Sequence, residues 1–359
     1  DYIYTGEVIS PEVSLTYNGM QLVEGVDYKI TTWAKDPGND QFVYIDSVAS
    51  MTTKYVGSKT LRVNILAPSG DIAALPNPEI EDQYYTGKAI IPDFELKNDN
   101  YTLKNGVDYT VTGSSNVEVG TAVLTITGMG TYEGGEKIVK FKILPKPIED
   151  CTISYSSERD YAMGLAVNAA VTVKNGDVTM KAGTDYTISY DNNTDATTEA
   201  SFTITPKSSN YTGDPVTKTF TINPLKLQRS GNGFSMSSIS DQQYTGKAIT
   251  PSVTIKRTQN GVTYPLVQDK DYTVEYSDNN TYVGSTVTVT ISGTGNFGGT
   301  INLTFSIVKR ELSQCEVEDI GDQLYTGSEI TPDIVIKNGD VTLEAGTDFT
   351  VKFEDNTEA

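Results

Sequence analysis

The chain has 359 residues, no histidine, two cysteines and a formal net charge of −20. This acidic balance predicts that the chain binds no nucleic acid, because phosphate backbones require a basic face, and it disfavours anionic membranes. The missing histidine removes the commonest general base and the usual zinc ligand. No apolar run in the sequence is long enough to cross a bilayer, so we expect no membrane insertion within this segment.

A short motif recurs about every eighty residues along the chain, which is the signature of a repeated structural unit. It stands at Tyr4-Thr5-Gly6, Tyr85-Thr86-Gly87, Tyr244-Thr245-Gly246 and Tyr325-Thr326-Gly327, with a degraded copy at Tyr161-Ala162-Met163-Gly164. An acidic-aromatic pair follows each copy, at Asp27-Tyr28, Asp108-Tyr109, Asp185-Tyr186, Asp271-Tyr272 and Asp348-Phe349. A period of this length suits a small independent domain.

The predicted elements follow the same order in each copy, as short runs in which apolar and polar residues alternate. Alternation with period two, rich in β-branched and aromatic residues, indicates half-buried strands. No window has a sustained helical period. The runs lie at 94–96, 109–111, 122–126 and 139–143 in the second copy, at 171–173, 186–190, 200–204 and 220–222 in the third, and at 253–255, 272–276, 287–291 and 303–307 in the fourth.

We therefore predict an all-β fold, a tandem array of small Ig-like or fibronectin-III-like β-sandwich domains that forms an elongated rod. The domains are expected at 1–70 (divergent, without an obvious first strand), 71–146, 147–225, 226–309 and 310–359 (truncated). Most joints are short, and only Gln228 to Gly233 is expected to be flexible. A rod of four and a half such units would reach about 160–180 Å.

Both recurring motifs have structural interpretations. In Tyr-Thr-Gly, the tyrosine can bury its ring and keep its hydroxyl near water or a carbonyl, while the glycine supplies a turn with positive φ. In the second motif, Gly-x-Asp-Tyr, a turn leads into a strand and the aspartate accepts local backbone N–H bonds.

The first copy contains the only tryptophan, Trp33, within an elongated segment from Thr31 to Asp40. A tryptophan on such a loop serves either as a ligand platform or as a plug for the local core. Trp33 is the only candidate ligand-binding residue that the sequence offers.

The two cysteines, Cys151 and Cys315, stand ten residues before the tyrosine position of their repeats, where other copies have Leu75 and Phe234. An apolar residue replaces cysteine at the same place, so we expect both thiols to be buried small hydrophobes. Their equivalent positions in repeats two apart argue against a disulfide between them.

No motif in the chain predicts catalysis, and we expect no enzyme activity, no catalytic residue and no cofactor. Residues 293–298 match the Gly-x-Gly-x-x-Gly string, but a strand follows where a dinucleotide site needs a helix, so we expect a hairpin. Carboxylates gather at Asp36 and Asp40 and at 316–319 without an obvious cleft for glycoside hydrolysis. Acidic loops at the joints could hold Ca²⁺, although no EF-hand loop is present.

A lysine follows Tyr-Thr-Gly in two copies, as Lys88 and Lys247, which raises the possibility of an intramolecular Lys–Asn amide crosslink. The same position holds Glu7 and Ser328 in two other copies. A required nucleophile would not vary in this way, so the crosslink is disfavoured.

The strings at 244–251, 183–193 and 287–298 resemble the tandem Ig-like repeats of secreted and cell-surface proteins of gut bacteria. The resemblance covers nearly the whole chain and implies an extracellular, bacterial cell-surface or secreted location. It implies a non-enzymatic structural stalk or adhesive segment that projects or spaces other modules, with host or cell-surface glycans or proteins as partners. The alternative is a set of carbohydrate-binding accessory domains of a secreted polysaccharide-degrading enzyme, which exposed coplanar aromatic rings on one sheet face would favour.

Overall fold

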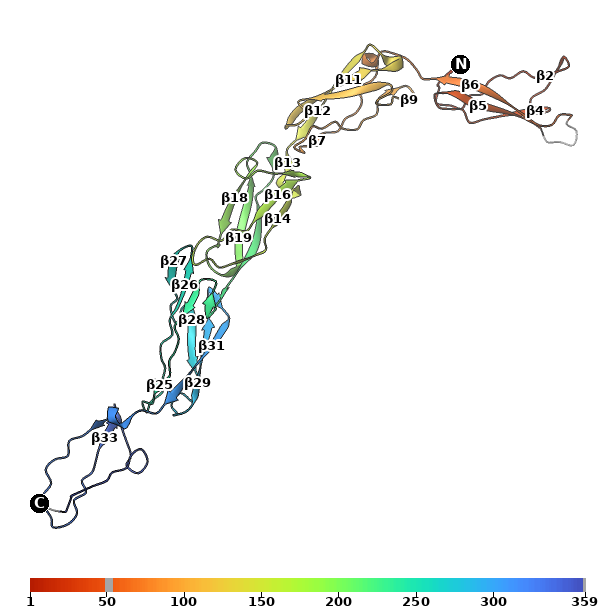
Figure 1. The fold of residues 1–359 in the computed structure, drawn as a ribbon. Coiled ribbons are helices and arrows are strands. Elements are labelled where there is room, and N and C mark those ends of the chain that lie inside the picture. The colour runs from red at the N-terminus through yellow and green to blue at the C-terminus, as the bar shows by residue number, and fades with distance from the viewer. Residues whose placement is uncertain (49–53, 358–359) are drawn as a thin grey trace. The chain divides into compact units, whose positions relative to one another are not determined.

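The computed structural model describes residues 1–48 and 54–357, and these residues form short β-strands with four single-turn 3₁₀ helices (Figure 1). The prediction of an all-β fold is confirmed. Contacts divide the chain into two compact units, of which the first comprises residues 1–154, 172–188 and 204–216 and the second residues 155–171, 189–203 and 217–359. No helix among the described residues is long and apolar enough to cross a membrane.

The first repeat builds one four-stranded sheet in the order β1-β6-β5-β4 and a separate hairpin of β2 and β3. β1 runs parallel to β6, and the other pairs are antiparallel. Ile9, Ala34 and Ile65 form its small core. The strands are β1 (Tyr2–Ile3), β2 (Thr16–Tyr17), β3 (Met20–Gln21), β4 (Tyr28–Thr32), β5 (Gly38–Ser47) and β6 (Ser58–Leu66).

The second repeat has the same plan, with the sheet order β10-β11-β12-β7 and a hairpin of β8 and β9. Alternate residues of β11 and β12 are fully buried, as the period-two pattern predicts, and Ala122, Leu124 and Phe141 lie in its core. Its elements are η1 (Ile72–Ala74), β7 (Gln83–Tyr84), β8 (Lys97–Asn98), β9 (Tyr101–Thr102), β10 (Tyr109–Ser114), β11 (Gly120–Gly128), η2 (Gly130–Tyr132) and β12 (Glu136–Leu144).

The third repeat contributes residues to both compact units. Within the first unit β16 and β17 form a hairpin, and within the second unit β15 runs parallel to β21. Its elements are β13 (Lys146–Pro147), η3 (Ile148–Asp150), β14 (Thr152–Tyr155), β15 (Glu158–Asp160), β16 (Val171–Asn175), β17 (Val178–Thr179), β18 (Tyr186–Asp191), β19 (Thr197–Pro206), β20 (Tyr211–Thr212) and β21 (Val216–Asn223).

The fourth repeat has the most regular sandwich of the second unit, with sheets β25-β31-β29-β28 and β23-β24-β26-β27. Val287, Val289 and Phe305 lie in its core. Its strands are β22 (Leu225–Lys226), β23 (Ser230–Gly231), β24 (Phe234–Met236), β25 (Gln242–Gln243), β26 (Ile255–Gln259), β27 (Val262–Pro265), β28 (Tyr272–Tyr276), β29 (Thr286–Gly293), β30 (Phe297–Gly298) and β31 (Thr300–Val308).

The last fifty residues form only a small sheet among the described positions, in the order β32-β33-β34. Its elements are η4 (Leu312–Gln314), β32 (Glu316–Val317), β33 (Ile336–Asn338) and β34 (Val341–Thr342). Ile336 and Phe349 are buried in this part.

Two local expectations are wrong. The segment Gln228 to Gly233 is not an irregular flexible linker, because β23 pairs with β24 across Asn232 and Gly233, which both have positive φ. Asn-Gly is the preferred two-residue hairpin turn, and this signal was present in the sequence. Both cysteines are free, but only Cys151 is buried, whereas Cys315 is half-buried beside a much smaller sheet.

The string at 293–298 is a strand-to-strand turn, as predicted. β29 ends at Gly293, Gly295 has a φ of +60°, and β30 begins at Phe297. A helix, which a dinucleotide site would need, does not follow.

Candidate functional site: the joints between repeats

The Tyr-Thr-Gly motif lies where one repeat meets the next, and we call each such contact a joint. The glycines of all five copies have positive φ, as predicted, with values from +76° to +83°. The tyrosines of the first three copies, Tyr4, Tyr85 and Tyr161, also pack on the following repeat, whereas Tyr244 packs on the core of its own repeat. Sequence reasoning found the turn and missed the docking.

At the first joint, Tyr4 packs edge-on against Tyr101, with the ring centroids 5.4 Å apart. The Tyr4 hydroxyl donates to the backbone carbonyl of Asn100 at 3.2 Å, and the Asn100 amide donates back to the carbonyl of Thr5 at 3.2 Å. Tyr4 is packed against the core of the second repeat. A residue of the first repeat therefore extends the core of the second.

At the second joint, Tyr85 packs edge-on against Tyr211 at 5.4 Å, and the Asn175 side chain donates to the Tyr85 carbonyl at 2.9 Å. A Cβ built on Gly87 would lie 3.2 Å from a methyl group of Val178, so the glycine also permits close approach. Lys88 pairs with Asp177 at 3.6 Å.

The fourth joint repeats the asparagine, lysine–aspartate and glycine–valine contacts with equivalent residues, without the contact between aromatic rings. The Asn338 side chain donates to the carbonyl of Tyr244 at 3.2 Å, and Lys247 pairs with Asp340. A Cβ on Gly246 would lie 2.5 Å from a methyl group of Val341. Real Cβ atoms do not approach so closely, so only glycine fits this position without a shift.

The motif meets the same hairpin of the following repeat at these three joints. Strand register pairs Asn98 with Tyr101, Asn175 with Val178, and Asn338 with Val341. The residue that the motif touches therefore occupies one equivalent hairpin position, as Tyr101, Val178 and Val341. The sequence signal was the recurring pair Lys97-Asn98, Lys174-Asn175 and Lys337-Asn338.

Charges at the joints are matched. Where lysine follows the motif glycine, as Lys88 or Lys247, an aspartate faces it from the next repeat. Where Glu7 follows the glycine, the facing position holds the neutral Asn100. The ion pairs are exposed and contribute at most about 1 kcal/mol each, so their main effect is to exclude like charges. These lysines are exposed and face aspartates, so the pairs do not form a Lys–Asn crosslink site.

The third joint departs from this pattern on both sides. Tyr161 still packs edge-on against Phe297 at 5.6 Å, and Tyr161 and Met163 pack on the core of the fourth repeat. The hairpin position of Asn175 and Asn338 is taken by Arg257 here. Gln259 contributes the bond to the motif, by donating to the Ala162 carbonyl at 3.5 Å.

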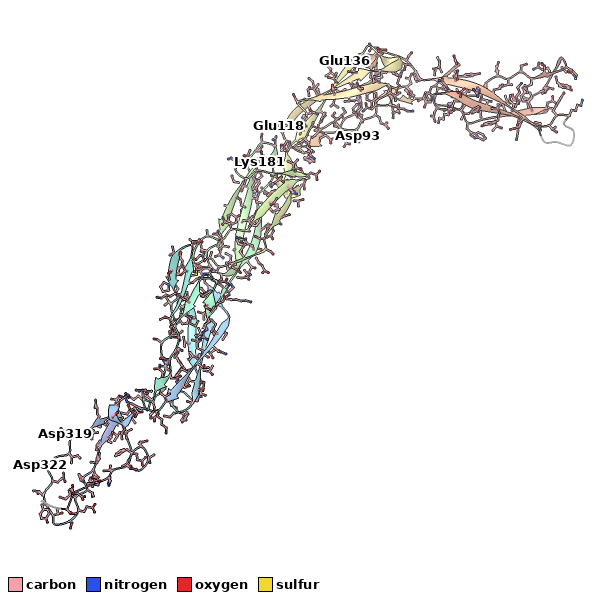
Figure 2. All side chains as sticks on the ribbon, viewed as in Figure 1. Asp93, Glu118, Glu136, Lys181, Asp319 and Asp322 are labelled. Carbon is pink, nitrogen blue, oxygen red and sulfur yellow. The ribbon has the colours of Figure 1, made fainter. Side chains whose placement is uncertain are left out.

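An asparagine side chain makes a further, recurrent contact at the second and third joints. The Asn210 side chain accepts from the backbone of Val119 at 3.2 Å and donates to Glu118, which is labelled in Figure 2. Asn296 makes the same two contacts, accepting from Ala196 at 2.7 Å and donating to Asp195 at 2.9 Å. Each asparagine thus joins a loop of the preceding repeat to a turn of its own repeat.

Burial at the joints changes the ionisation of their tyrosines. Desolvation raises the pKa of Tyr85 and of Tyr161, and it raises the pKa of Tyr211 to about 12. Burial disfavours the charged phenolate, so these hydroxyls ionise only at a higher pH than free tyrosine. In the fifth copy Tyr325 is 59% exposed.

The Gly-x-Asp-Tyr motif is a turn inside each repeat, as predicted. In every copy the aspartate accepts a backbone N–H from four residues earlier, at 2.7 to 2.9 Å; the acceptors are Asp27, Asp108, Asp185, Asp271 and Asp348. The glycine has positive φ in four copies, and Asp269 takes this conformation in the fourth. The bonds of this motif lie within its own repeat. In one copy the aspartate also binds a residue that takes part in a joint.

This aspartate is Asp108, which is only 4% exposed and accepts a second bond, from the Tyr101 hydroxyl at 2.9 Å. Burial, followed by the bond to Asp108, raises the pKa of Tyr101 to about 12. Because Tyr101 is the ring on which Tyr4 packs, Asp108 positions one surface of the first joint.

Trp33 is not a plug for the core, since 74% of its side chain is exposed. It lies 6.1 Å from the ring of Tyr44, which in turn lies 6.5 Å from Phe42. We call these three residues the aromatic patch; Phe42 and Tyr44 are 42% and 39% exposed. Register places threonine at the position of Tyr44 in other repeats, as Thr125 and Thr290.

The predicted acidic clusters take part in ordinary ion pairs. Asp40 pairs with Arg62 at 3.2 Å, beside the aromatic patch, and Arg62 also lies over the ring of Phe42. Glu318 pairs with Lys337. Within residues 1–48 and 54–357, no group of three or more acidic or cysteine side chains is placed to hold a metal ion.

No known protein family and no curated protein matches the chain. Among solved structures it is similar to the human desmocollin-1 ectodomain, with 9% identity over 75% of this chain and 64% of that one and a TM-score of 0.17. It is similar to domains 4–9 of the surface layer protein SbsC, with 13% identity over 90% and 48% and a TM-score of 0.16. Cadherin-like domains 1 to 4 of zebrafish RET give 10% identity over 76% and 83% and a TM-score of 0.16.

Proposed function

We propose that the chain is a non-enzymatic structural stalk or adhesive segment of a bacterial cell-surface or secreted protein, in which tandem repeats space other modules as a rod. The observation that carries this proposal is the recurrence of docking contacts at the joints, with the same asparagine and lysine–aspartate contacts at the second and the fourth. A spacer must transmit orientation from one domain to the next, and short joints with buried aromatic contacts restrict rotation between domains. The resemblance to bacterial surface repeats supplies the expected location.

Solution scattering of the full chain tests the rod. We expect an extended particle with a maximum dimension of about 160–180 Å, estimated from strand rise and domain count. Because the joints consist of rings, amides and lysine–aspartate pairs, we expect the dimension to stay the same when EDTA is added. A compact particle would refute the rod, and shortening by EDTA would show that Ca²⁺ stiffens the joints.

The aromatic patch favours carbohydrate binding as a second candidate function. Exposed rings on one sheet face can stack on the apolar faces of sugars, and the Asp40–Arg62 pair supplies polar groups beside them. The second and fourth repeats have threonine at the position of Tyr44, so the ring of Tyr44 has no counterpart in either of them.

Glycan-array binding of the full chain tests this second function. We expect Trp33→Ala and Tyr44→Ala to reduce binding of a selected glycan about tenfold each, since loss of one stacking ring costs roughly 1.5 kcal/mol. Tyr282→Ala is the matched control, because Tyr282 is similarly exposed but lies in the fourth repeat. Equal losses in all three variants, or no selective binding by the unaltered chain, would exclude the patch as a sugar site.

A further inference from the structure

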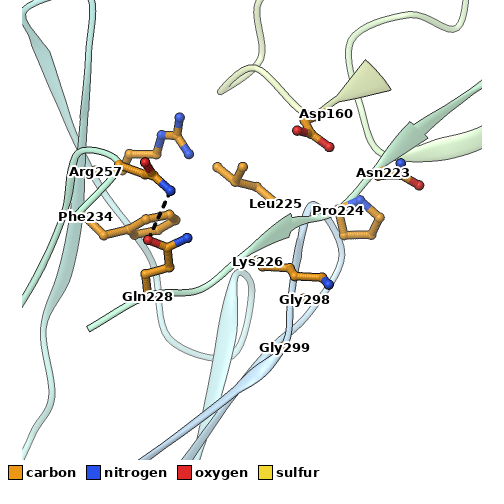
Figure 3. Close-up of a pocket in the computed structure, with 11 residues that line it drawn as sticks. Asp160, Asn223, Pro224, Leu225, Lys226, Gln228, Phe234, Arg257, Gly298 and Gly299 are labelled. Carbon is orange, nitrogen blue, oxygen red and sulfur yellow. Dashed lines mark hydrogen bonds between the residues drawn. The ribbon is translucent and has the colours of Figure 1, made fainter. Parts of the chain in front are cut away.

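A pocket of about 900 Å³ lies in the second compact unit, beside the third joint (Figure 3). This volume falls in the range of small-molecule sites. Charged, amide and aromatic side chains line it together, namely Asp160, Asn223, Lys226, Gln228, Phe234 and Arg257. The pocket is found where the joint contacts depart from the common pattern.

Arg257 is the unusual member of this pocket. It occupies the hairpin position whose asparagine binds the motif carbonyl at the second and fourth joints. Its guanidinium group lies over the ring of Phe234, 5.2 Å from the ring centroid. The Nε and Nη1 atoms are buried, and neither has a hydrogen-bond acceptor among the described residues. Desolvation lowers the pKa of Arg257, and the nearby Asp160 charge offsets only part of this effect, so the guanidinium charge is not fully compensated.

The protein's own acceptors do not neutralise this charge. Asp160 lines the same pocket, but it forms no ion pair with Arg257 among the described residues. The side-chain oxygen of Gln228 is used by the Asn232 amide at 3.2 Å, the bond drawn in Figure 3. A guanidinium favours a carboxylate as its partner, because a charged N–H donor and a charged acceptor form a strong hydrogen bond.

We propose that this pocket binds a carboxylated sugar, with the carboxylate on Arg257 and the ring hydroxyls facing the amides of Asn223 and Gln228. Arg257 supplies the charge selectivity and Lys226 adds positive potential. The Asn223 amide nitrogen donates to Glu158 and the Gln228 oxygen accepts from Asn232, so the Asn223 oxygen supplies an acceptor and the Gln228 nitrogen supplies donors for hydroxyl groups. A simple inorganic anion would leave most of the 900 Å³ and its amides unused. The site lies beside the third joint and does not use the contacts of the second and fourth joints, on which the spacer proposal rests.

Isothermal titration of the full chain with glucuronate, glucose and acetate tests the site. We expect glucuronate to bind, glucose to bind far more weakly, and acetate to bind more weakly than glucuronate. Loss of a hydrogen-bonded charge in Arg257→Gln should reduce glucuronate affinity about tenfold or more. Asp160→Asn should increase the affinity several-fold, because it removes a like charge from the pocket.

Lys256→Gln is the matched control, since Lys256 is the exposed neighbour of Arg257 on β26 and does not line the pocket. It should leave glucuronate affinity unchanged. Thermal unfolding of each variant separates lost binding from lost folding. Asp160→Asn is expected to increase affinity, and a misfolded variant could not give that result. Absence of glucuronate binding, equal affinity for acetate, or equal effects of Lys256→Gln and Arg257→Gln would each overturn the proposal.

Discussion

Asp108→Ala is expected to lower the stability of the second repeat by about 3 kcal/mol, because a buried acceptor that holds two donors is removed. The Lys104 amide, at 2.8 Å, and the Tyr101 hydroxyl, at 2.9 Å, would both lose their partner. The chain forms two compact units, so its unfolding cannot be treated as two-state, and the readout is hydrogen exchange of the β11 and β12 amides. Their protection should fall about a hundredfold.

The matched control for this change is Asp271→Ala in the fourth repeat. Asp271 accepts the equivalent backbone bond from Val267 at 2.8 Å, and among the described residues no side chain donates a second bond to it. We expect a loss of only about 1 kcal/mol in that repeat. Equal losses in the two variants would contradict the role assigned to the second bond of Asp108.

Gly246→Ala is expected to weaken the docking of the fifth repeat on the fourth by about 2–4 kcal/mol, the sum of left-handed backbone strain and overpacking. The added Cβ would lie 2.5 Å from Val341, at a φ of +76°. Loss of docking should release the Asn338 bond to the Tyr244 carbonyl. Hydrogen exchange in the hairpin 336–342 should therefore rise by more than about tenfold.

Two variants separate strain from contact at this joint. Gly327→Ala introduces alanine at a similar φ of +78°, in a motif copy with nothing within 4 Å of the added Cβ. It should cost only the backbone strain, about 1–2 kcal/mol. Val341→Ala in the Gly246→Ala background should restore part of the docking by removing the clash. If Val341→Ala restores no docking, Gly246 is required for its positive φ alone and not for its close approach to Val341.

The sequence predicts the strands well because half-buried strands have an unambiguous period of two. The residues Val287, Val289 and Phe305 were expected to be buried and are buried. The turn roles of the motif glycines and of the aspartates could also be predicted, because they depend only on local backbone geometry. The positions of Gly87 and Asp108 illustrate this.

The joints could not be predicted, because they depend on contacts between residues about ninety positions apart. Asn175 reaches the Tyr85 carbonyl, and nothing local to either residue indicates this. The exposure of Trp33 likewise depends on which side of the sheet its loop follows, and the sequence left core plug and ligand platform open. Arg257 stands in the β26–β27 hairpin where other repeats have an asparagine. The sequence alone does not show that this position lies in a hairpin beside a pocket.

The central claim is that the Tyr-Thr-Gly motifs at Tyr4, Tyr85 and Tyr244 dock on the hairpin of the next repeat, and zero-length carbodiimide cross-linking of the full chain tests it most directly. Mass spectrometry should find amide bonds between Lys88 and Asp177 and between Lys247 and Asp340, which face each other across joints. Lys146 and Asp150, paired at 3.0 Å within one segment, are the internal control. A cross-link at this control pair with none at either joint would contradict the account.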